Sequence, residues 1–254
     1  MRILVLNPNF SEGITKRLVA AATKAAAPGT MIASATAPRG VPYISTRAEA
    51  QIAGAIALEM LAERHREYDA AIIAAFGDPG LLAARELFDL PVVGMAEASM
   101  LTACMLGRRF AIVTFARAMG PWYQECVETH GMKERCAGLR MIDEPFDLIC
   151  DVQEEKEDRL VAEANRAVQD LDADVVIFAG APLAGLAEKV RERIPVPVID
   201  QMAAAVKQSE ALVGLNLRKA TVGTFRRPDA KNTRGLAAAL AARIERADGE
   251  ARAI

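Results

Sequence analysis

Two segments of this chain carry small residues at the point where a strand gives way to a helix. Residues 69–81 read DAAIIAAFGDPGL and residues 174–186 read DVVIFAGAPLAGL, so each runs from a buried-strand pattern through a small-residue turn into a helix. Backbone N–H groups at a helix start can bind carboxylates and stabilise enolates, and small side chains let a ligand approach them. Close packing of a helix on a strand would also require small residues. The first interpretation predicts two facing half-sites for a small anionic ligand.

Further ligand contacts are expected from other turns that follow strands, because the carboxyl ends of strands form the ligand crevice in open α/β sheets. Asn9 follows the first strand, Tyr43 lies in the Pro- and Gly-rich segment 38–46, and Thr114 ends a strand. The Asn-Pro-Asn turn is also ordinary turn chemistry, and Ser45 or its neighbour would cap the next helix. The predicted substrate-binding residues are Asn9, Tyr43, Ser45, Phe76, Gly77, Thr114, Gly180, Ala181 and Pro182.

Carboxylates close to these turns are the candidates for moving a proton. Asp78 lies in the first small-residue turn, Glu97 begins the helix after the Pro-Val-Val-Gly run at 91–94, and Asp200 occupies the matching place in the second half. We predict Asp78 and Glu97 as catalytic acid/base residues. The helix dipole also favours acidic residues at a helix start, which leaves a purely structural role open for both.

Motifs for bound metals and nucleotides are missing from the sequence. The four cysteines form no CxxC pair, and the two histidines, His65 and His130, are far apart in the chain. There is neither a GxGxxG nor a GxxxxGK[ST] motif, and no Ser-His-Asp set can be assembled. We therefore expect no cofactor and no metal.

The elements that must position these residues alternate between short β-branched runs and helical patterns, which is typical of parallel α/β sheets. We expect two lobes with the active site between them, the first made of residues 1–95 and 213–254 and the second of residues 96–212. Helices are predicted at 47–66, at 152–171 and in the Ala-rich C-terminal stretch 234–254. Strands are predicted at 2–6, 31–36, 70–75, 91–94, 109–114, 138–142, 174–178, 196–199 and 220–224.

The composition is that of an ordinary globular protein. Of 254 residues, 52% are hydrophobic and 25% charged, with a net charge of −2, and the densest basic cluster, around Arg226 and Arg227, is too small to track a phosphate backbone. No apolar run approaches the roughly 18 residues that a membrane span requires. The N-terminal apolar run is too short for a signal sequence. We expect a cytoplasmic protein that binds a small molecule and neither nucleic acid nor membrane.

Four of these features together resemble the hydantoin racemase branch of the aspartate/glutamate racemase superfamily. They are the Asn-Pro-Asn turn at 7–9, the Gly-Asp-Pro-Gly-Leu turn at 77–81 with Arg85-Glu86, the segment from 91 to Ala98, and Pro-Val-Ile-Asp at 197–200. The resemblance implies two pseudo-symmetric α/β lobes, no cofactor, a homo-oligomer, and a small carboxylate or ureide as substrate.

The resemblance also implies one cysteine at the strand end of each lobe, so that two thiols can move a proton on opposite faces of the substrate. In this sequence those positions fall on Ala75 and Ala181, and neither side chain can accept a proton. Three hypotheses remain open. The protein is a racemase-like isomerase of a cyclic ureide or an amino-acid-like carboxylate that uses other groups, a decarboxylase, lyase or hydrolase that stabilises an enolate, or a ligand-binding homologue without catalysis.

Overall fold

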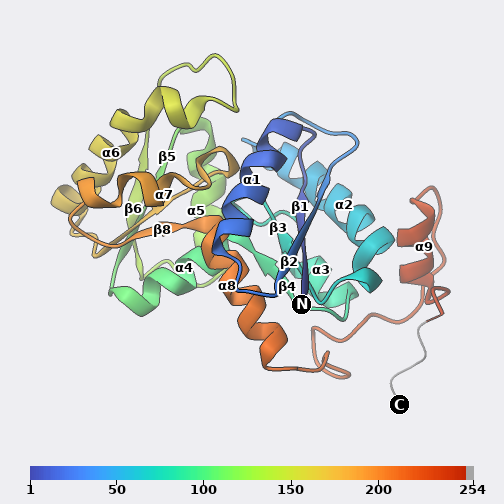
Figure 1. The fold of residues 1–254 in the computed structure, drawn as a ribbon. Coiled ribbons are helices and arrows are strands. Elements are labelled where there is room, and N and C mark those ends of the chain that lie inside the picture. Colours follow the sequence, from blue (N-terminus) through green and yellow to red (C-terminus); the bar gives the residue numbers. More distant parts are fainter. Residues whose placement is uncertain (250–254) are drawn as a thin grey trace.

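The computed structural model, which describes residues 1–249, contains two four-stranded parallel sheets that lie side by side (Figure 1). The first has the order β2-β1-β3-β4 and the second the order β6-β5-β7-β8, so both sheets follow the same plan. The first is built from β1 (Arg2–Asn7), β2 (Met31–Thr36), β3 (Ala70–Ile73) and β4 (Val92–Gly94), and the second from β5 (Phe110–Thr114), β6 (Cys136–Met141), β7 (Val175–Phe178) and β8 (Val198–Asp200).

A helix follows each of these strands, so each half of the chain repeats a strand-helix unit four times. Side chains mark several helix starts: the Ser11 hydroxyl accepts a hydrogen bond from a backbone N–H of the first helical turn, and Thr46 forms a capping box with Glu49. The helices are α1 (Glu12–Ala25), α2 (Arg47–Arg64), α3 (Leu81–Leu87), α4 (Met95–Leu106), α5 (Gly120–Thr129), α6 (Val152–Leu171), α7 (Leu186–Val190), α8 (Gln201–Gly214) and α9 (Ala238–Glu245). Short 3-10 segments lie at His65–Glu67, Arg117–Met119, Ala181–Leu183 and Arg191–Arg193.

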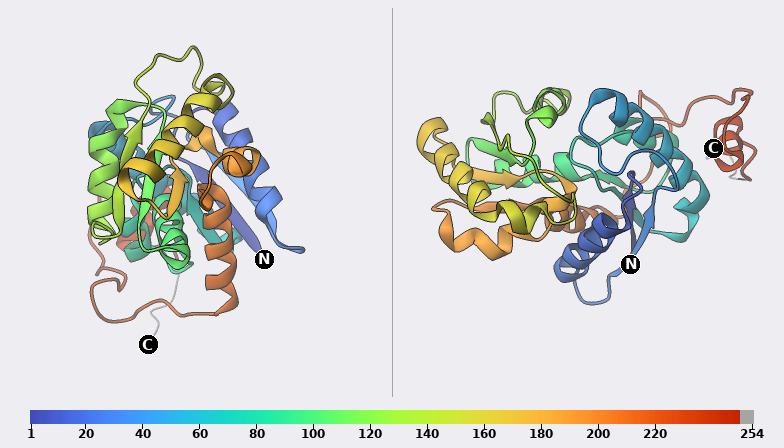
Figure 2. Two further views of the ribbon diagram at one scale, coloured as in Figure 1. Left: turned by 90° about the vertical axis from the view of Figure 1, so that its left-hand side faces the viewer. Right: turned by 90° about the horizontal axis from the view of Figure 1, so that it is seen from above.

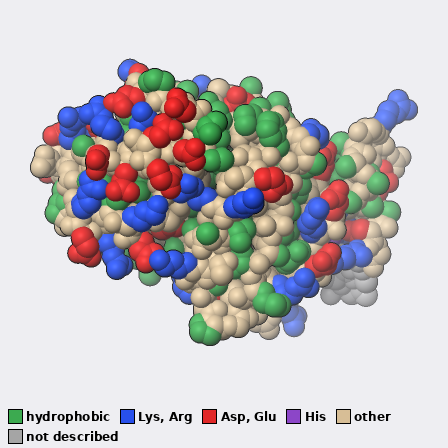
Figure 3. All heavy atoms as spheres, turned by 45° about the horizontal axis from the view of Figure 1, so that its top comes forward, with side chains coloured by type: hydrophobic (Ala, Val, Ile, Leu, Met, Phe, Trp, Pro, Cys, Tyr) green, Lys and Arg blue, Asp and Glu red, His purple; other side chains and the backbone are tan. Residues whose placement is uncertain are grey.

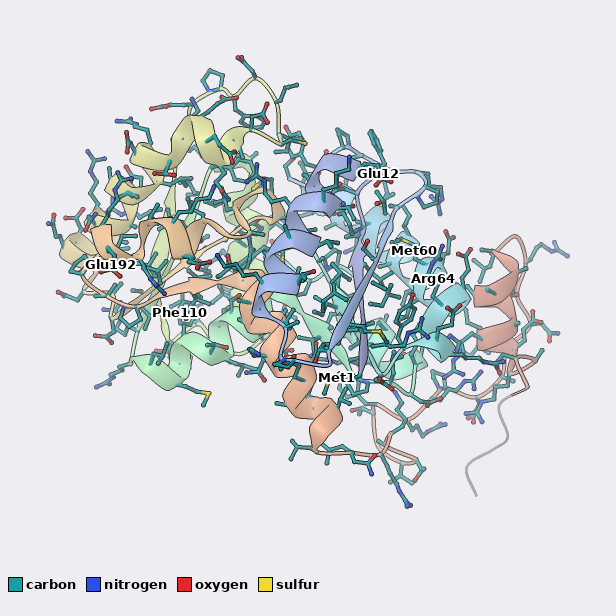
Figure 4. The ribbon with its side chains drawn as sticks, in the orientation of Figure 1. Met1, Glu12, Met60, Arg64, Phe110 and Glu192 are labelled. Atoms are coloured by element: carbon teal, nitrogen blue, oxygen red, sulfur yellow. The ribbon has the colours of Figure 1, made fainter. Side chains whose placement is uncertain are left out.

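Apolar side chains on both faces of the first sheet are buried, as expected for a parallel sheet covered by helices. On one face Leu6 packs in a core with Met60 of α2, which is labelled in Figure 4. On the other face Val5 belongs to a larger core that continues through α1 and α8 to Ile112 of the second sheet. The two lobes, seen from above in Figure 2, therefore share one continuous apolar core.

The C-terminal segment departs from the prediction at one point. The expected strand at 220–224 is wrong, because residues 215–237 form no helix or strand and Val222 is 76% exposed. Neither four-stranded sheet includes this run, so its backbone groups form no strand ladder. The predicted helix is present as α9, which packs against α2 through the buried Leu240, and the final residues 250–254 of that prediction lie outside the described part.

The surface carries charges of both signs. On the face drawn in Figure 3, Lys and Arg side chains are mixed with Asp and Glu, and neither sign forms a block there. Among the described residues, no helix combines the length and the apolar composition that a membrane span requires.

Candidate active site

A small cavity lies between the two lobes, where the strand ends of β3 and β7 meet side chains from α5. The side chains leave about 20 Å³ of space there, and one water molecule needs roughly 10–15 Å³. A ring-sized ligand therefore requires the lining to open. The lining residues are Asn9, Ile14, Tyr43, Ile44, Ala75, Phe76, Phe115, Met119, Trp122, Tyr123, Gly180, Ala181 and Pro182.

The internal repeat identifies Gly180 as the counterpart of Ala75. In the sheet registers, Ile73 ends β3 beside β1, and Phe178 ends β7 beside β5 in the same way. The residue that directly follows each strand, Ala74 or Ala179, donates its N–H to a carbonyl of the neighbouring strand at 2.8 Å. Ala75 and Gly180 are each two positions beyond the strand end, and a left-handed glycine five positions later begins the next helix in both halves.

This pairing moves the second cysteine-equivalent position from Ala181, where the sequence alone placed it, to Gly180. The correction matters because the backbone differs: Gly180 has a φ of 114°, a left-handed conformation that favours glycine. A Cβ placed on Gly180 would lie 2.8 Å from Cε1 of Phe115. A side chain at this position therefore requires Phe115 to move.

Aromatic side chains from both lobes line part of the cavity wall. The ring of Phe76 lies 4.9 Å from that of Tyr123, whose other neighbour, Trp122, is 5.4 Å away between ring centroids. On the outer side, Phe146 contacts both Tyr43 and Phe115 edge to face. Except for Tyr43 and Phe76, these aromatic residues were not predicted as site residues.

Tyr123 places a hydroxyl group beside the second cysteine-equivalent position. Its Oη would lie 3.6 Å from a Cβ on Gly180, and the residue is 1% exposed. Burial raises the pKa of Tyr123 above its ordinary value, with the nearby thiol of Cys126 acting in the same direction and the Thr114 hydroxyl against it. The phenol is therefore neutral at physiological pH, and it can donate a proton to an anion formed in the cavity.

Asn9 supplies a polar group at the first-lobe side of the cavity. Its Oδ1 accepts hydrogen bonds from Asn7 Nδ2 at 3.1 Å and from the Ser11 N–H at 2.9 Å. Asn7 in turn donates to the Thr15 hydroxyl at 2.9 Å. This network fixes the orientation of the Asn9 amide, and its Nδ2 group is the part that can donate to a ligand.

Three predicted binding residues lie outside the cavity. The N–H and hydroxyl of Ser45 donate to the Glu49 carboxylate, and the Thr114 hydroxyl, which is fully buried, donates to the Ala179 carbonyl at 2.8 Å. Gly77 lines a second cavity behind Trp122. Its φ of 109° and the close approach of the Trp122 ring explain why glycine stands there. The remaining predicted contacts, Asn9, Tyr43, Phe76, Gly180, Ala181 and Pro182, all line the first cavity.

The predicted catalytic carboxylates of Asp78 and Glu97 also lie outside the first cavity. Asp78 accepts hydrogen bonds from the N–H groups of Ala96 and Glu97 at 2.8 Å each. Its carboxylate therefore caps the N-terminus of α4, although Asp78 itself belongs to the turn after β3. The Glu97 carboxylate forms a bidentate ion pair with the Arg85 guanidinium group. The structure thus gives both carboxylates the helix-start role that the dipole favours, and their catalytic role remains a prediction.

His130 connects the two carboxylates. Its Nε2 lies 3.1 Å from Asp78 Oδ2 and its Nδ1 lies 3.4 Å from Glu97 Oε1, while its side chain is 6% exposed. Burial alone would lower the pKa of His130, but the hydrogen bonds to Asp78, Cys126 and Glu97 outweigh it and raise the value to about 12. Burial likewise opposes ionisation of Glu97, yet His130 and Arg85 lower its pKa to about 2. The group is therefore an ion network that joins α5 to the first lobe.

Fewer backbone N–H groups face a ligand than the sequence suggested. The N–H of Asp78 bonds to the Ala75 carbonyl at 3.0 Å, and the N–H of Gly180 donates to Gln201 Oε1 at 3.0 Å. Both donors serve to hold their turns in place. An anion site between the lobes would rely on the remaining N–H groups of the two turns together with Asn9 and Tyr123.

Comparisons with known proteins place the chain among racemases. It matches the family described as Asp/Glu/Hydantoin racemase over residues 3–209. A hydantoin racemase of Pseudomonas sp. (strain NS671) is 33% identical over 235 residues, which cover 91% of this chain and 93% of that protein. The structure of allantoin racemase from Klebsiella pneumoniae is similar with a TM-score of 0.87 and 36% identity, covering 92% and 96% of the two chains. Arylmalonate decarboxylase shares the fold alone, with a TM-score of 0.59 and 17% identity over 84% and 93%.

These findings confirm the predicted resemblance and the predicted fold class of two α/β lobes. The family match covers both sheets from β1 to β8, except for Arg2 at the start of β1. The relatives span nearly the whole chain, so the likeness is not confined to one lobe. The chain therefore belongs to the Asp/Glu/hydantoin racemase family.

Proposed function

We propose that this protein is a cofactor-independent isomerase that exchanges the proton on the carbon beside a carbonyl group of a small cyclic ureide, and that it does so without a pair of thiols. The observation that carries the proposal is the position of the Tyr123 hydroxyl, next to the place where a side chain at Gly180 would begin. A proton-carrying group thus stands at one end of the cavity that Ala75 and Gly180 line.

The substrate class follows from the relatives and from the chemistry of the wall. Hydantoin and allantoin, which the names of the similar racemases give, share a five-membered cyclic ureide ring with an acidic C–H carbon beside a carbonyl. The aromatic wall suits a flat ring, and the amide of Asn9 suits the carbonyl or N–H edge of a ureide. The absence of a positively charged side chain among the described lining residues favours a neutral ureide over a carboxylate.

In the proposed step, a hydroxide ion from solvent takes the proton of the ring C–H bond and becomes water, and the electron pair of that bond forms an enolate on the neighbouring carbonyl. The neutral Tyr123 phenol then gives its proton to the ring carbon on the Gly180 side, and solvent returns a proton to the phenolate. Such general acid catalysis is worth roughly 10²–10⁴-fold in rate. Low polarity around the phenol strengthens its hydrogen bond to the developing anion.

Deuterium incorporation tests the proposal. An enantiopure hydantoin or allantoin is incubated with the protein in D₂O, the ring C–H signal is followed by NMR, and optical rotation is followed in parallel. We expect loss of the C–H signal faster than in a protein-free sample, together with loss of rotation. Absence of both effects over a panel of cyclic ureides would contradict the proposal. Ligand-dependent thermal stabilisation without turnover would instead identify a binding protein.

A second candidate is decarboxylation, which the one-sided placement of Tyr123 favours. Loss of CO₂ from a carboxylated substrate leaves its electron pair on the carbon as an enolate, so no base is needed and a single proton donor completes the reaction. Tyr123 can fill that role alone. Release of CO₂ from a malonate-type or carboxylated ureide substrate, without solvent exchange at non-carboxylated ureides, would select this function over isomerisation.

A further inference from the structure

Three side chains that bind transition metals converge behind Trp122, although they are far apart in the sequence. Cys126 lies in the last turn of α5, His130 directly follows the end of that helix, and Asp78 reaches them from the turn after β3 in the other lobe. One ligand atom from each residue, namely Sγ, a ring nitrogen and a carboxylate oxygen, lies within 4.8 Å of the other two. No local pattern predicts this cluster, because the cysteine and histidine spacing matches no zinc motif by itself.

The spacing between His130 and Asp78 suits two ligands of one tetrahedral ion. Two ligands at the usual zinc–nitrogen and zinc–oxygen distances of about 2.0–2.1 Å lie roughly 3.3 Å apart in a tetrahedron. Nε2 of His130 is 3.1 Å from Oδ2 of Asp78. Each oxygen of Asp78 accepts one backbone N–H, which leaves lone pairs for an ion.

The groups behind His130 have the arrangement that supports a metal-bound imidazole. The other ring nitrogen, Nδ1, lies 3.4 Å from the Glu97 carboxylate, and Arg85 holds that carboxylate from the opposite side. In metalloproteins a carboxylate in this position fixes the imidazole tautomer and ring orientation. The carboxylate of Glu97 can therefore orient His130 toward an ion without contacting it.

All three side chains line an open cavity of about 520 Å³, within the range of roughly 300–1,000 Å³ for small-molecule sites. An ion held by three protein ligands keeps a fourth position, which here would face this cavity. Trp122 lines both this cavity and the one between the strand ends. The site is thus a neighbour of the proposed active site and does not depend on its activity.

From this geometry we propose that Asp78, Cys126 and His130 form a binding site for a divalent transition metal ion of the Zn²⁺ type, which links α5 of the second lobe to the first lobe. Thiolate and imidazole ligands select such an ion over Mg²⁺ or Ca²⁺, which prefer oxygen. Binding replaces the thiol proton and the proton on His130 Nε2, so two protons leave and no electron is transferred.

A catalytic thiol is the competing interpretation of the same cluster, and the surroundings of Cys126 argue against it. The residue is 5% exposed, so little of its side chain is open to an incoming electrophile. A nucleophilic cysteine needs a stabilised thiolate at neutral pH. A metal ion supplies that stabilisation itself, because it binds the deprotonated form.

Cobalt titration tests the site directly. Chelator-treated protein is titrated with Co²⁺, and the near-ultraviolet band of a thiolate–Co²⁺ bond is recorded together with the visible bands of a tetrahedral ion. We expect one Co²⁺ per chain with both features, displaced by Zn²⁺ and not by Mg²⁺. The absence of a thiolate band in the unaltered protein, or displacement by Mg²⁺, would overturn the proposal.

Variants separate this site from other thiols. Cys126→Ala should lose the band and bind Co²⁺ at least about tenfold more weakly. Cys104→Ala is the matched control and should keep both, because its thiol lies on α4 beside Met132 Sδ, 3.9 Å away. Glu97→Gln keeps all three ligands and should preserve the band while weakening Co²⁺ binding by about 10–100-fold. A band that persists in Cys126→Ala, or that vanishes in Cys104→Ala, would contradict the assignment.

Discussion

Ala75 and Gly180 occupy the same position in the two repeats, each two residues beyond the end of a central strand, and both line one cavity between the lobes. The duplicated fold therefore keeps the two opposed positions from which relatives are expected to move protons. In this chain those positions hold alanine and glycine, which cannot accept or donate a proton through a side chain. A proton-carrying group, the Tyr123 hydroxyl of helix α5, lies beside the Gly180 position.

Introducing thiols at the two positions should create fast proton exchange. We expect Ala75→Cys combined with Gly180→Cys, in a Phe115→Leu background that makes room for the new side chain, to raise deuterium uptake by a hydantoin on the order of 10²-fold. Phe115 must be replaced because its ring would lie 2.8 Å from the new Cβ. The measurement is NMR of the ring C–H in D₂O.

The matched comparison is Ala75→Cys with Ala181→Cys in the same Phe115→Leu background. If Gly180 is the true counterpart of Ala75, this second pair should give less exchange than the first, because its thiols are not related by the repeat. Greater exchange in the Ala181 variant would show that the repeat has been aligned wrongly. The strained φ of 114° at position 180 makes a check of folding by circular dichroism necessary.

Removing the Tyr123 hydroxyl should reduce turnover without unfolding the protein. Tyr123→Phe keeps the ring contacts with Phe76 and Trp122 and loses a weak hydrogen bond to Met119 Sδ at 3.5 Å. We expect a loss of roughly 10²-fold in exchange rate and a change of about 1 kcal/mol or less in stability.

The pH profile adds an independent check on Tyr123. Because burial raises its pKa above the ordinary value of 10.0, the rate should not fall as the pH passes through that value. Tyr68→Phe, which lies outside the cavity beneath Arg2, is the control and should leave exchange unchanged. Full activity in Tyr123→Phe would remove this residue from the mechanism.

Most of the fold could be predicted from the sequence, because its strands are short apolar runs bounded by Pro, Gly or charged residues. Eight of the predicted strands are present within one to two residues at most ends, and Thr46, the neighbour of Ser45, caps its helix as predicted. The failure at 220–224 has a physical reason. Apolar alternation predicts a strand only where a sheet edge is available, and edge availability depends on the whole topology.

The site was less predictable, because its parts come from segments that only the fold brings together. The turn residues of β3 and β7 could be identified as cavity residues, since strand ends meet at one edge of a sheet. Tyr123, Trp122 and His130 could not, because α5 shows only an ordinary amphipathic pattern in the sequence. Contacts between a helix of one lobe and a turn of the other leave no pattern in the local amino-acid sequence.

Replacing Asp78 distinguishes a structural from a catalytic role. Asp78→Asn removes the charge that faces the buried His130, and we expect it to lower the free energy of unfolding by about 3 kcal/mol. Asp174→Asn is the control: its carboxylate also accepts two backbone N–H groups, at 2.8 Å each, but it is exposed and faces no histidine in the described structure. Chemical denaturation measures both. Unchanged stability together with loss of proton exchange in Asp78→Asn would show that Asp78 is a catalytic base.

Asp248 should make the attachment of the C-terminal segment sensitive to acid. Burial opposes its ionisation, but hydrogen bonds from Arg243 at 2.8 Å and Arg227 at 2.9 Å outweigh it and hold the pKa of Asp248 below its ordinary value of 3.8. A lowered native pKa contributes stability that is complete above the ordinary value and is lost as the pH falls through the native one. Asp248→Asn should therefore lower the free energy of unfolding by roughly 1–2 kcal/mol at neutral pH, and this difference should shrink as the pH falls below 3.8.

Asp172→Asn, at an exposed left-handed position that asparagine also tolerates, is the control and should show no such convergence. Denaturation curves for the three proteins across this pH range decide the matter, and a difference between Asp248→Asn and the unaltered protein that does not depend on pH would contradict the assigned role of the carboxylate.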